Sequence, residues 1–237
     1  MRFKELMQYT YDSISSGKKL KNYFKDIITG AEFYFEVINN MLYIWVEPSN
    51  ERQDWYTNLF AKSIKLNDGR CHYGYYLAAT RFLNYLDKIG LYAYKDVLVT
   101  GYSMGGGITK VLAYLFPKQY ISNPKFNIYA VSIEGAKVLN KRAAQNLKRN
   151  TTVKLFTIIN NNDIVTKIPF NFVQSGQVIK IGKEKRRWYK GIKFRLALKE
   201  KGLLYKFFTV PGHEFADTKK NLKIFIDGIL EGDNYEL

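Results

Sequence analysis

The sequence is poor in the residues that build disulfide-linked or metal-bound folds. Among its 237 residues there is one cysteine, Cys71, and there are two histidines, His72 and His213. A single thiol cannot form an intramolecular disulfide, and no group of cysteines and histidines has the spacing of metal ligands. We therefore expect no metal and no cofactor, and a fold that is stabilised by its hydrophobic core.

Long apolar runs are also absent. No run reaches the length needed to cross a membrane, and Arg2, Lys4 and Glu5 stand where a signal peptide would need apolar residues. With 46% hydrophobic and 24% charged residues, the chain fits one globular domain with a substantial core. The sequence predicts a single domain over residues 1–237 and a cytoplasmic location, with release by lysis or a dedicated route still open.

Acidic residues are few compared with basic ones. The chain has 21 Asp and Glu against 37 Lys and Arg, which gives a formal net charge of +16. Such a charge favours contact with a polyanion such as nucleic acid, an anionic lipid surface or an acidic glycan. A lysine-rich surface that meets only solvent explains the same composition. Charge alone therefore does not identify a partner.

Strand and helix patterns succeed one another along the chain. Residues 3–30 are interpreted as helical or irregular, whereas residues 31–48, centred on Asn39-Asn40, predict a β-hairpin. Between residues 73 and 160, helical spacing alternates with strand-like runs, which predicts right-handed crossovers and a mainly parallel sheet with the hairpin at its edge. Short strand-like pieces from 170 to 212 predict a basic antiparallel excursion before a last helix over 214–230. The fold class is α/β.

One short motif carries the chemistry of a nucleophile. Gly101-Tyr102-Ser103-Met104-Gly105 matches G-x-S-x-G, in which a serine lies on a tight turn from a strand to a helix. The residues before it form a strand pattern and those after it a helix pattern, which is the context that the motif requires. A glycine-rich phosphate loop is the alternative, but a Walker-type loop needs Lys followed by Ser or Thr where Gly107-Ile108 stand. Ser103 is the predicted nucleophile.

A serine nucleophile needs a base to accept its proton, and histidine is the usual one. His213 follows Ser103 in the chain and precedes the last helix, which agrees with the order Ser, acid, His of an α/β-hydrolase. His72 lies upstream of Ser103 and is interpreted as a structural residue near the site. His213 is therefore the predicted base.

The base in turn needs a carboxylate that holds its tautomer. Asp163 is the one aspartate between Ser103 and His213, and it follows a strong strand pattern. Its side chain is therefore expected at the same carboxyl edge of the sheet as Ser103. Glu134, which follows an earlier strand pattern, is the second candidate acid. The alternative interpretation of Asp163 is a turn residue among asparagines.

An acyl-transfer site also needs hydrogen-bond donors for the developing oxyanion. The backbone N–H of Met104, the residue after the nucleophile, is one candidate. The second donor is expected from an earlier strand end, where the hairpin strand leads to Ser49. Met104 and Ser49 are the predicted oxyanion hole.

Together these segments resemble the class 3 lipase family of α/β-hydrolases. The resemblance rests on five segments within residues 42–169, and it implies the α/β-hydrolase fold with Ser103 as nucleophile, Asp163 as acid and His213 as base. It also implies oxyanion donors at Ser49 and Met104 and a structural role for His72. Glu47-Pro48 departs from the family's Arg-Gly before the oxyanion residue. The five segments are VLVTGYSMGGGITKVLAYL, EPSNERQDWYTNL, CHYGYYLAA, VSIEGAKVLN and NNNDIVTKIP.

The sequence therefore predicts a serine carboxylic-ester hydrolase that acts on an acyl lipid through an acyl-Ser103 intermediate. Phospholipid ranks ahead of triglyceride because of the positive charge, and an anionic membrane surface is the expected second partner, ahead of nucleic acid. The main alternative is a catalytically impaired protein of the same fold that binds an anionic membrane or nucleic acid through its basic surface. An amidase or acyltransferase with the same triad also fits the residues.

Overall fold

The computed structural model describes residues 1–47, 63–91, 96–119, 126–161, 163, 165–182 and 215–229. Its centre is one seven-stranded sheet, and a separate hairpin pairs two short strands. The strands are β1 (Asn22–Lys25), β2 (Glu32–Ile38), β3 (Met41–Glu47), β4 (Ser63–Leu66), β5 (Gly69–His72), β6 (Asp96–Tyr102), β7 (Asn127–Ile133), β8 (Val153–Asn160) and β9 (Gln177–Ile181). The strand order in the central sheet is β1-β2-β3-β6-β7-β8-β9, and β4 pairs with β5.

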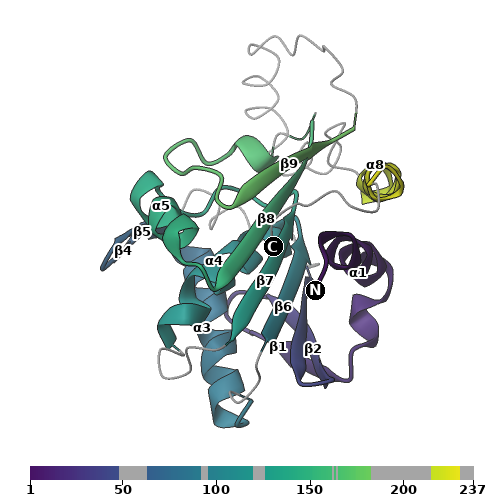
Figure 1. Cartoon of the computed structure of the whole chain (residues 1–237). Coiled ribbons are helices and arrows are strands. Elements are labelled where there is room, and N and C mark those ends of the chain that lie inside the picture. The colour runs from purple at the N-terminus through teal and green to yellow at the C-terminus, as the bar shows by residue number, and fades with distance from the viewer. Residues whose placement is uncertain are drawn as a thin grey trace, which may run out of the picture.

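The helices lie on both faces of the central sheet (Figure 1). Within the described ranges, no helix is both long enough and apolar enough to cross a membrane. The helices are α1 (Phe3–Ser16), α3 (Tyr73–Lys88), α4 (Met104–Gln119), α5 (Lys141–Arg149) and α8 (Phe215–Asp227), with 3-10 turns η1 (Gly17–Lys19) and η2 (Val165–Lys167).

The hairpin predicted around Asn39-Asn40 is confirmed. Ile38 pairs with Met41 in the antiparallel ladder of β2 and β3. Asn39 and Asn40 have φ values of 50° and 64°. Two central residues in the left-handed region match the right-handed twist of the flanking strands, and asparagine tolerates this region better than most residues.

The strands β3, β6, β7, β8 and β9 run parallel, so their carboxyl ends meet at one edge of the sheet. This carboxyl edge points upward in Figure 1. Strand β6 is buried over almost its whole length, as expected of a central parallel strand covered on both faces. The predicted α/β class with a mainly parallel sheet is confirmed.

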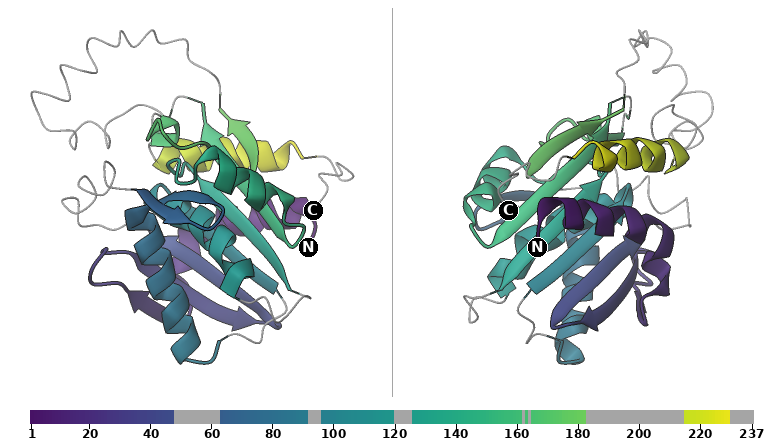
Figure 2. Two further views of the ribbon diagram at one scale, coloured as in Figure 1. Left: turned by 90° about the vertical axis from the view of Figure 1, so that its left-hand side faces the viewer. Right: turned by 45° about the vertical axis from the view of Figure 1, so that its right-hand side comes forward.

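Two separate apolar cores hold the layers together. Helices α3, α4 and α5 cover one face of the sheet, and α1 and α8 lie together on the other (Figure 2). On the first face, Phe82 of α3 stacks on Phe33 of β2 with ring centroids 4.2 Å apart. On the second face, Phe3 of α1 contacts Phe156 of β8 at a centroid distance of 5.1 Å.

The direction of β9 differs from the sequence-based expectation. The antiparallel arrangement predicted from residue 170 onward is wrong for β9, which pairs parallel with β8 from Phe156↔Gln177 to Asn160↔Ile181. The chain leaves β8 at the carboxyl edge and crosses back before β9 begins, and such a crossover gives a parallel pair. The rest of the predicted excursion, residues 183–214, lies outside the described residues.

Two short paired segments were not predicted. Strand β1 lies within residues interpreted as helical or irregular, and three of its four residues are exposed. The β4–β5 hairpin joins Ser63 to His72 and directly precedes α3. Strands of four residues at a sheet edge carry too few alternating apolar positions for a sequence pattern to reveal them.

The stacked pair in the first core gives a stability prediction. Phe82→Ala should lower the free energy of unfolding by about 3–5 kcal/mol, because it removes a fully buried ring and leaves a cavity. Urea denaturation measures this value. The control is Ile224→Ala on α8, whose side chain is 61% exposed and whose loss should change stability by less than about 0.5 kcal/mol. Equal effects of the two substitutions would contradict this assignment of the core.

Candidate active site

Ser103 occupies a sharp turn between β6 and α4. Its φ is +54°, a conformation that residues other than glycine rarely adopt and that structures retain mainly at functional sites. Its N–H donates to the Ile133 carbonyl at 2.8 Å, and its own carbonyl accepts from the Gly107 N–H at 3.1 Å. Ser103 is half-buried, whereas Tyr102 and Met104 on either side are buried. The backbone therefore presents the serine between two buried neighbours.

Glycines allow this turn to pack against the sheet. A Cβ on Gly105 would lie 1.9 Å from the Val46 carbonyl oxygen of β3, and one on Gly101 would lie 2.4 Å from the Gly105 carbonyl carbon. A Cβ on Gly107 would lie 2.5 Å from the ring of Tyr75 in α3. The start of α4 thus lies directly against β3 and α3, which only glycine permits.

Asp163 lies three residues beyond the end of β8 and is fully buried. Its N–H donates to the Asn160 carbonyl at 2.9 Å, and its Oδ1 accepts from the Val165 N–H at 2.8 Å. Burial raises the pKa of the Tyr102 phenol, and the Glu134 and Asp163 carboxylates raise it further. The Asp163 carboxylate is therefore within electrostatic range of the residue that precedes Ser103.

Glu134, the second candidate acid, is engaged with the opposite face of the sheet. It follows β7 with a φ of +49°, and its side chain is fully buried. Its Oε1 accepts a 2.5 Å hydrogen bond from the Thr218 hydroxyl of α8, and its N–H donates to the Ile158 carbonyl at 2.8 Å. This arrangement is typical of a structural anchor, in this case between the carboxyl edge of the sheet and α8.

Of the other residues predicted for the site, the structure describes Met104 and His72. Met104 begins α4 and is buried, so its N–H belongs to the first turn of the helix. His72 is fully buried, donates its backbone N–H to the Val138 carbonyl at 2.9 Å and lies edge-on to Tyr75. This packing agrees with the structural role predicted for His72. Ser49 and His213 lie outside the described residues.

A small apolar cavity of about 20 Å³ lies beside Met104. Its volume corresponds to about one water molecule, so an acyl chain would need more room than this cavity offers. No local sequence pattern predicts this cavity, because its walls come from three segments that are distant in the chain. The lining residues are Thr29, Ala31, Gly74, Tyr75, Ala78, Met104 and Ile108.

Comparison with known proteins agrees with this geometry. The family model described as lipase (class 3) matches residues 27–173, which is more than half of the chain. The chain belongs to the class 3 lipase family. It is therefore a serine ester hydrolase with the α/β-hydrolase fold. No curated protein sequence matches the chain.

The lipase also resembles solved fungal lipase structures. Rhizomucor miehei triacylglyceride lipase is 18% identical, with a TM-score of 0.57 over 76% of this chain and 78% of that one. Lipase II from Rhizopus niveus is 17% identical, with a TM-score of 0.58 over 76% and 80%. A triacylglycerol lipase whose catalytic centre is formed by a serine protease triad is 16% identical, with a TM-score of 0.59 over 76% and 78%. At these identities the likeness shows the shared fold.

A buried lysine of this lipase links α4 to the segment that carries Asp163. Lys110 is fully buried, and its Nζ donates to the carbonyls of Gly135 and Ala136 at 2.8 and 3.0 Å and to Gln174 Oε1 at 2.5 Å. Gln174 Nε2 in turn donates to the Thr166 carbonyl at 2.5 Å. The network runs from α4, the helix that follows Ser103, to η2, next to Asp163. Sequence reasoning missed it, although a lysine between Thr109 and Val111 in an apolar helix was a signal.

Burial lowers the pKa of the Lys110 ammonium to about 7, a net shift that the Asp163 carboxylate opposes and the nearby Lys137 reinforces. Above pH 7 the unfolded chain therefore holds the proton that the folded lipase has lost. Because the folded-state pKa lies below the unfolded value, burying the charged lysine lowers the free energy of unfolding by its full amount at low pH. This loss of stability becomes smaller as the pH rises from about 7 toward the unfolded pKa of 10.5.

This shift predicts a specific pH dependence of stability. Between about pH 7 and pH 9, the free energy of unfolding of the wild type should rise by roughly 2 kcal/mol relative to that of Lys110→Met. Urea denaturation of both proteins over this range measures the difference, in which the contributions of shared tyrosines and Cys71 cancel. Parallel pH profiles would show that Lys110 does not titrate in this range.

The turn at Ser103 between β6 and α4, here called the elbow, gives a further prediction. Gly105→Ala should abolish ester hydrolysis and lower the free energy of unfolding by about 2 kcal/mol or more, because the new Cβ collides with the Val46 carbonyl. The matched control is Gly228→Ala after α8, where the nearest atoms would lie 3.5 Å away. The control should keep full activity, and an active Gly105→Ala variant would contradict the close packing of α4 on β3.

Proposed function

We propose that this lipase hydrolyses carboxylic esters of acyl lipids through an acyl-Ser103 intermediate. The observation that carries the proposal is the Ser103 turn, with its φ of +54° and its half-exposed side chain between buried neighbours at the carboxyl edge of the sheet. Strand β7 separates β6 from β8, so the segments with Ser103 and Asp163 leave the sheet at the same edge, two strands apart. This placement supports a nucleophile and an acid of one site.

In the proposed reaction the Ser103 oxygen attacks the ester carbonyl carbon while its proton passes to His213. Asp163 holds the neutral imidazole of His213 in the tautomer that accepts this proton and stabilises the imidazolium that results. The tetrahedral intermediate collapses, the C–O bond to the alcohol breaks, and the alcohol leaves with the proton from His213. A water molecule then attacks the acyl-Ser103 carbonyl in the same way, which releases the fatty acid and restores the serine.

The developing oxyanion is proposed to bind the N–H of Met104 and a donor from Ser49. The strand that leads to Ser49 is held firmly at its last residue. The Glu47 carboxylate accepts from Trp45 Nε1 at 2.7 Å and forms an ion pair with Lys18 at 3.0 Å. The Glu47 side chain, which departs from the family pattern, is therefore engaged with η1 on the α1 face of the sheet.

The substrate is proposed to be phospholipid ahead of triglyceride. The net charge of +16 favours substrates with anionic head groups, because each basic residue near an anionic lipid surface contributes about 1 kcal/mol of attraction. Neutral triglyceride offers no such attraction. The solved relatives are triacylglycerol lipases by name, so triglyceride is the comparison substrate.

The proposal is tested by hydrolysis of a water-soluble short-chain ester, an anionic phospholipid and a triglyceride. Ser103→Ala should lose at least about 1,000-fold in kcat on each substrate that the wild type cleaves, and Asp163→Asn should lose about 100- to 10,000-fold. Glu134→Gln, which keeps a carboxamide oxygen for the Thr218 hydroxyl, should stay within about tenfold of the wild type. Activity unchanged by Ser103→Ala would refute the proposed site. A larger loss of activity with Glu134→Gln than with Asp163→Asn would assign the role of the acid to Glu134 in place of Asp163.

A further inference from the structure

The turn between β1 and β2, residues 26–30, exposes two adjacent isoleucines. Ile27 is 88% exposed and Ile28 is 59% exposed. Single exposed apolar side chains are common on protein surfaces, but two large ones at the tip of one turn are a contiguous apolar projection. The rest of the turn is buried: Asp26 and Thr29 are 1% and 8% exposed.

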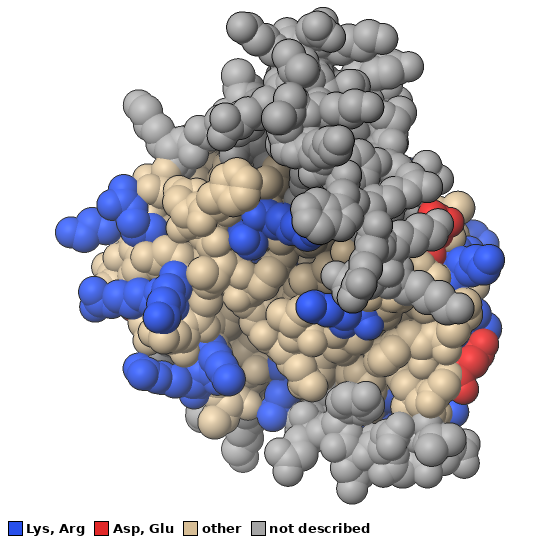
Figure 3. Space-filling view, turned by 90° about the horizontal axis from the view of Figure 1, so that it is seen from above, with Lys and Arg blue, Asp and Glu red and all other residues tan. Residues whose placement is uncertain are grey.

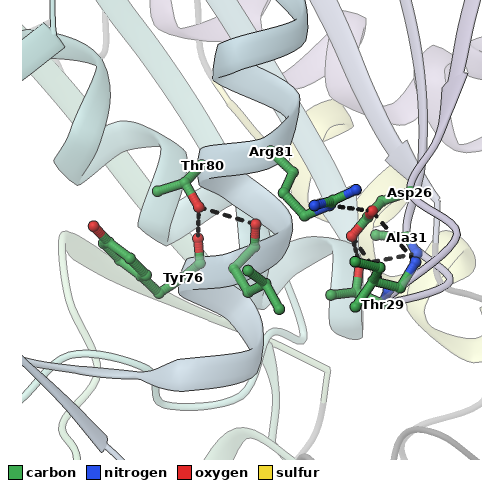
Figure 4. Close-up of polar contacts among 8 residues, drawn as sticks. Asp26, Thr29, Ala31, Tyr76, Thr80 and Arg81 are labelled. Atoms are coloured by element: carbon green, nitrogen blue, oxygen red, sulfur yellow. Dashed lines mark hydrogen bonds and ion pairs between the residues drawn. The ribbon is translucent and has the colours of Figure 1, made fainter.

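A buried hydrogen-bond network holds the turn rigid (Figure 4). The Asp26 carboxylate accepts from the Thr29 hydroxyl at 2.5 Å, from the Thr29 N–H at 3.2 Å and from Arg81 Nε of α3 at 2.5 Å. The Asp26 N–H donates to the Ala31 carbonyl at 2.9 Å and closes the turn. Because the backbone is fixed in this way, the two isoleucines would lose little backbone entropy when they are buried against another surface.

The turn lies at the same edge of the sheet as the candidate active site. Lys25 pairs with Glu32, and Glu32 pairs with Glu47, so the turn follows the carboxyl edge that β3 shares with β6. Thr29 lines the small apolar cavity together with Met104, the residue after the nucleophile. The exposed isoleucines therefore project from a turn that lies against the site itself.

The charge around this edge indicates the kind of surface that the turn would meet. Figure 3 looks down on the carboxyl edge and shows many Lys and Arg but few Asp or Glu on the described surface there. Lys25, directly before the turn, is exposed and pairs with Glu32 at 3.7 Å, and Lys167 of η2 is exposed after β8 at the same edge of the sheet. An apolar projection on a predominantly basic edge is complementary to a lipid layer with anionic head groups, into which the isoleucines insert while the cations of the edge stay outside.

We propose that the β1–β2 turn is a docking element through which the lipase binds an anionic lipid surface, with Ile27 and Ile28 entering the acyl region. Docking at this turn holds the carboxyl edge, and with it Ser103, against the layer that contains the substrate. The inference rests on the proposed acyl-lipid substrate and adds the surface by which the enzyme reaches it.

The test measures binding to vesicles of equal parts phosphatidylglycerol and phosphatidylcholine, by co-sedimentation of the full chain with Ser103→Ala so that no lipid is hydrolysed. Adding Ile27→Ser and Ile28→Ser should weaken partitioning by about 10- to 100-fold. The control pair, Ile38→Ser and Ile89→Ser, removes two exposed isoleucines at the opposite edge of the sheet and should leave partitioning unchanged. Equal partitioning of all three proteins would overturn the proposal.

A direct readout of insertion does not depend on how well the serine variants fold. The chain's single cysteine, Cys71, is buried, and burial raises the pKa of its thiol to about 12, so an Ile27→Cys variant offers one reactive thiol for a polarity-sensitive dye. The dye's emission should shift to the blue on the anionic vesicles and less on pure phosphatidylcholine. An unchanged spectrum on the anionic vesicles would contradict insertion of the turn.

Catalysis is measured separately, in proteins that retain Ser103. Hydrolysis of a water-soluble ester by Ile27→Ser/Ile28→Ser should equal that of the wild type, while hydrolysis of vesicle phospholipid should fall with binding. An equal loss of hydrolysis on the water-soluble ester and on the vesicle phospholipid would indicate damage to the active site, and it would overturn a role of the turn in docking alone. Because binding is measured without turnover, loss of docking supports the inference even if the wild type cleaves none of the esters tested.

Discussion

The contact between the first turn of α4 and the end of β3 is the constraint on which the site depends. A side chain at Gly105 would lie 1.9 Å from the Val46 carbonyl oxygen, so the helix begins here only because this residue is glycine. The close approach bends the backbone at Ser103 into the left-handed region and leaves the serine half-exposed. It also places the Met104 N–H beside the strand that continues toward Ser49.

Buried polar groups fix the carboxyl edge from both sides of the sheet. On the face of α3 and α4, the Lys110 ammonium donates to two backbone carbonyls and to Gln174. On the other face, the Glu134 carboxylate accepts from Thr218. Burying a charge is unfavourable unless hydrogen bonds satisfy it, and such groups more often define one geometry than add stability. The elbow and the segment with Asp163 are thereby tied to their surroundings by hydrogen bonds as well as by apolar packing.

Much of this architecture could be predicted from local patterns. Asn39-Asn40 marks a turn that needs two left-handed residues, and the G-x-S-x-G stretch lies between a strand and a helix pattern. Other features depend on distant partners. The direction of β9 is set by where the crossover after β8 ends, and the burial of Lys110 depends on the carbonyls of residues 135 and 136. The β1–β2 turn reaches the site through strand register, which no local pattern reveals. The catalytic roles of Ser103, Asp163 and His213 and the oxyanion roles of Ser49 and Met104 stay predictions from the sequence.

The identity of the nucleophile is tested most directly by covalent labelling of the folded protein with a fluorophosphonate, followed by peptide mapping by mass spectrometry. An activated serine forms a stable phosphonyl adduct, whereas ordinary surface serines do not react. We predict one adduct, on the peptide that contains Ser103, which disappears when the protein is unfolded before labelling. An adduct on a different serine, or none under conditions that label a reference serine esterase, would contradict the assignment of Ser103 as the nucleophile.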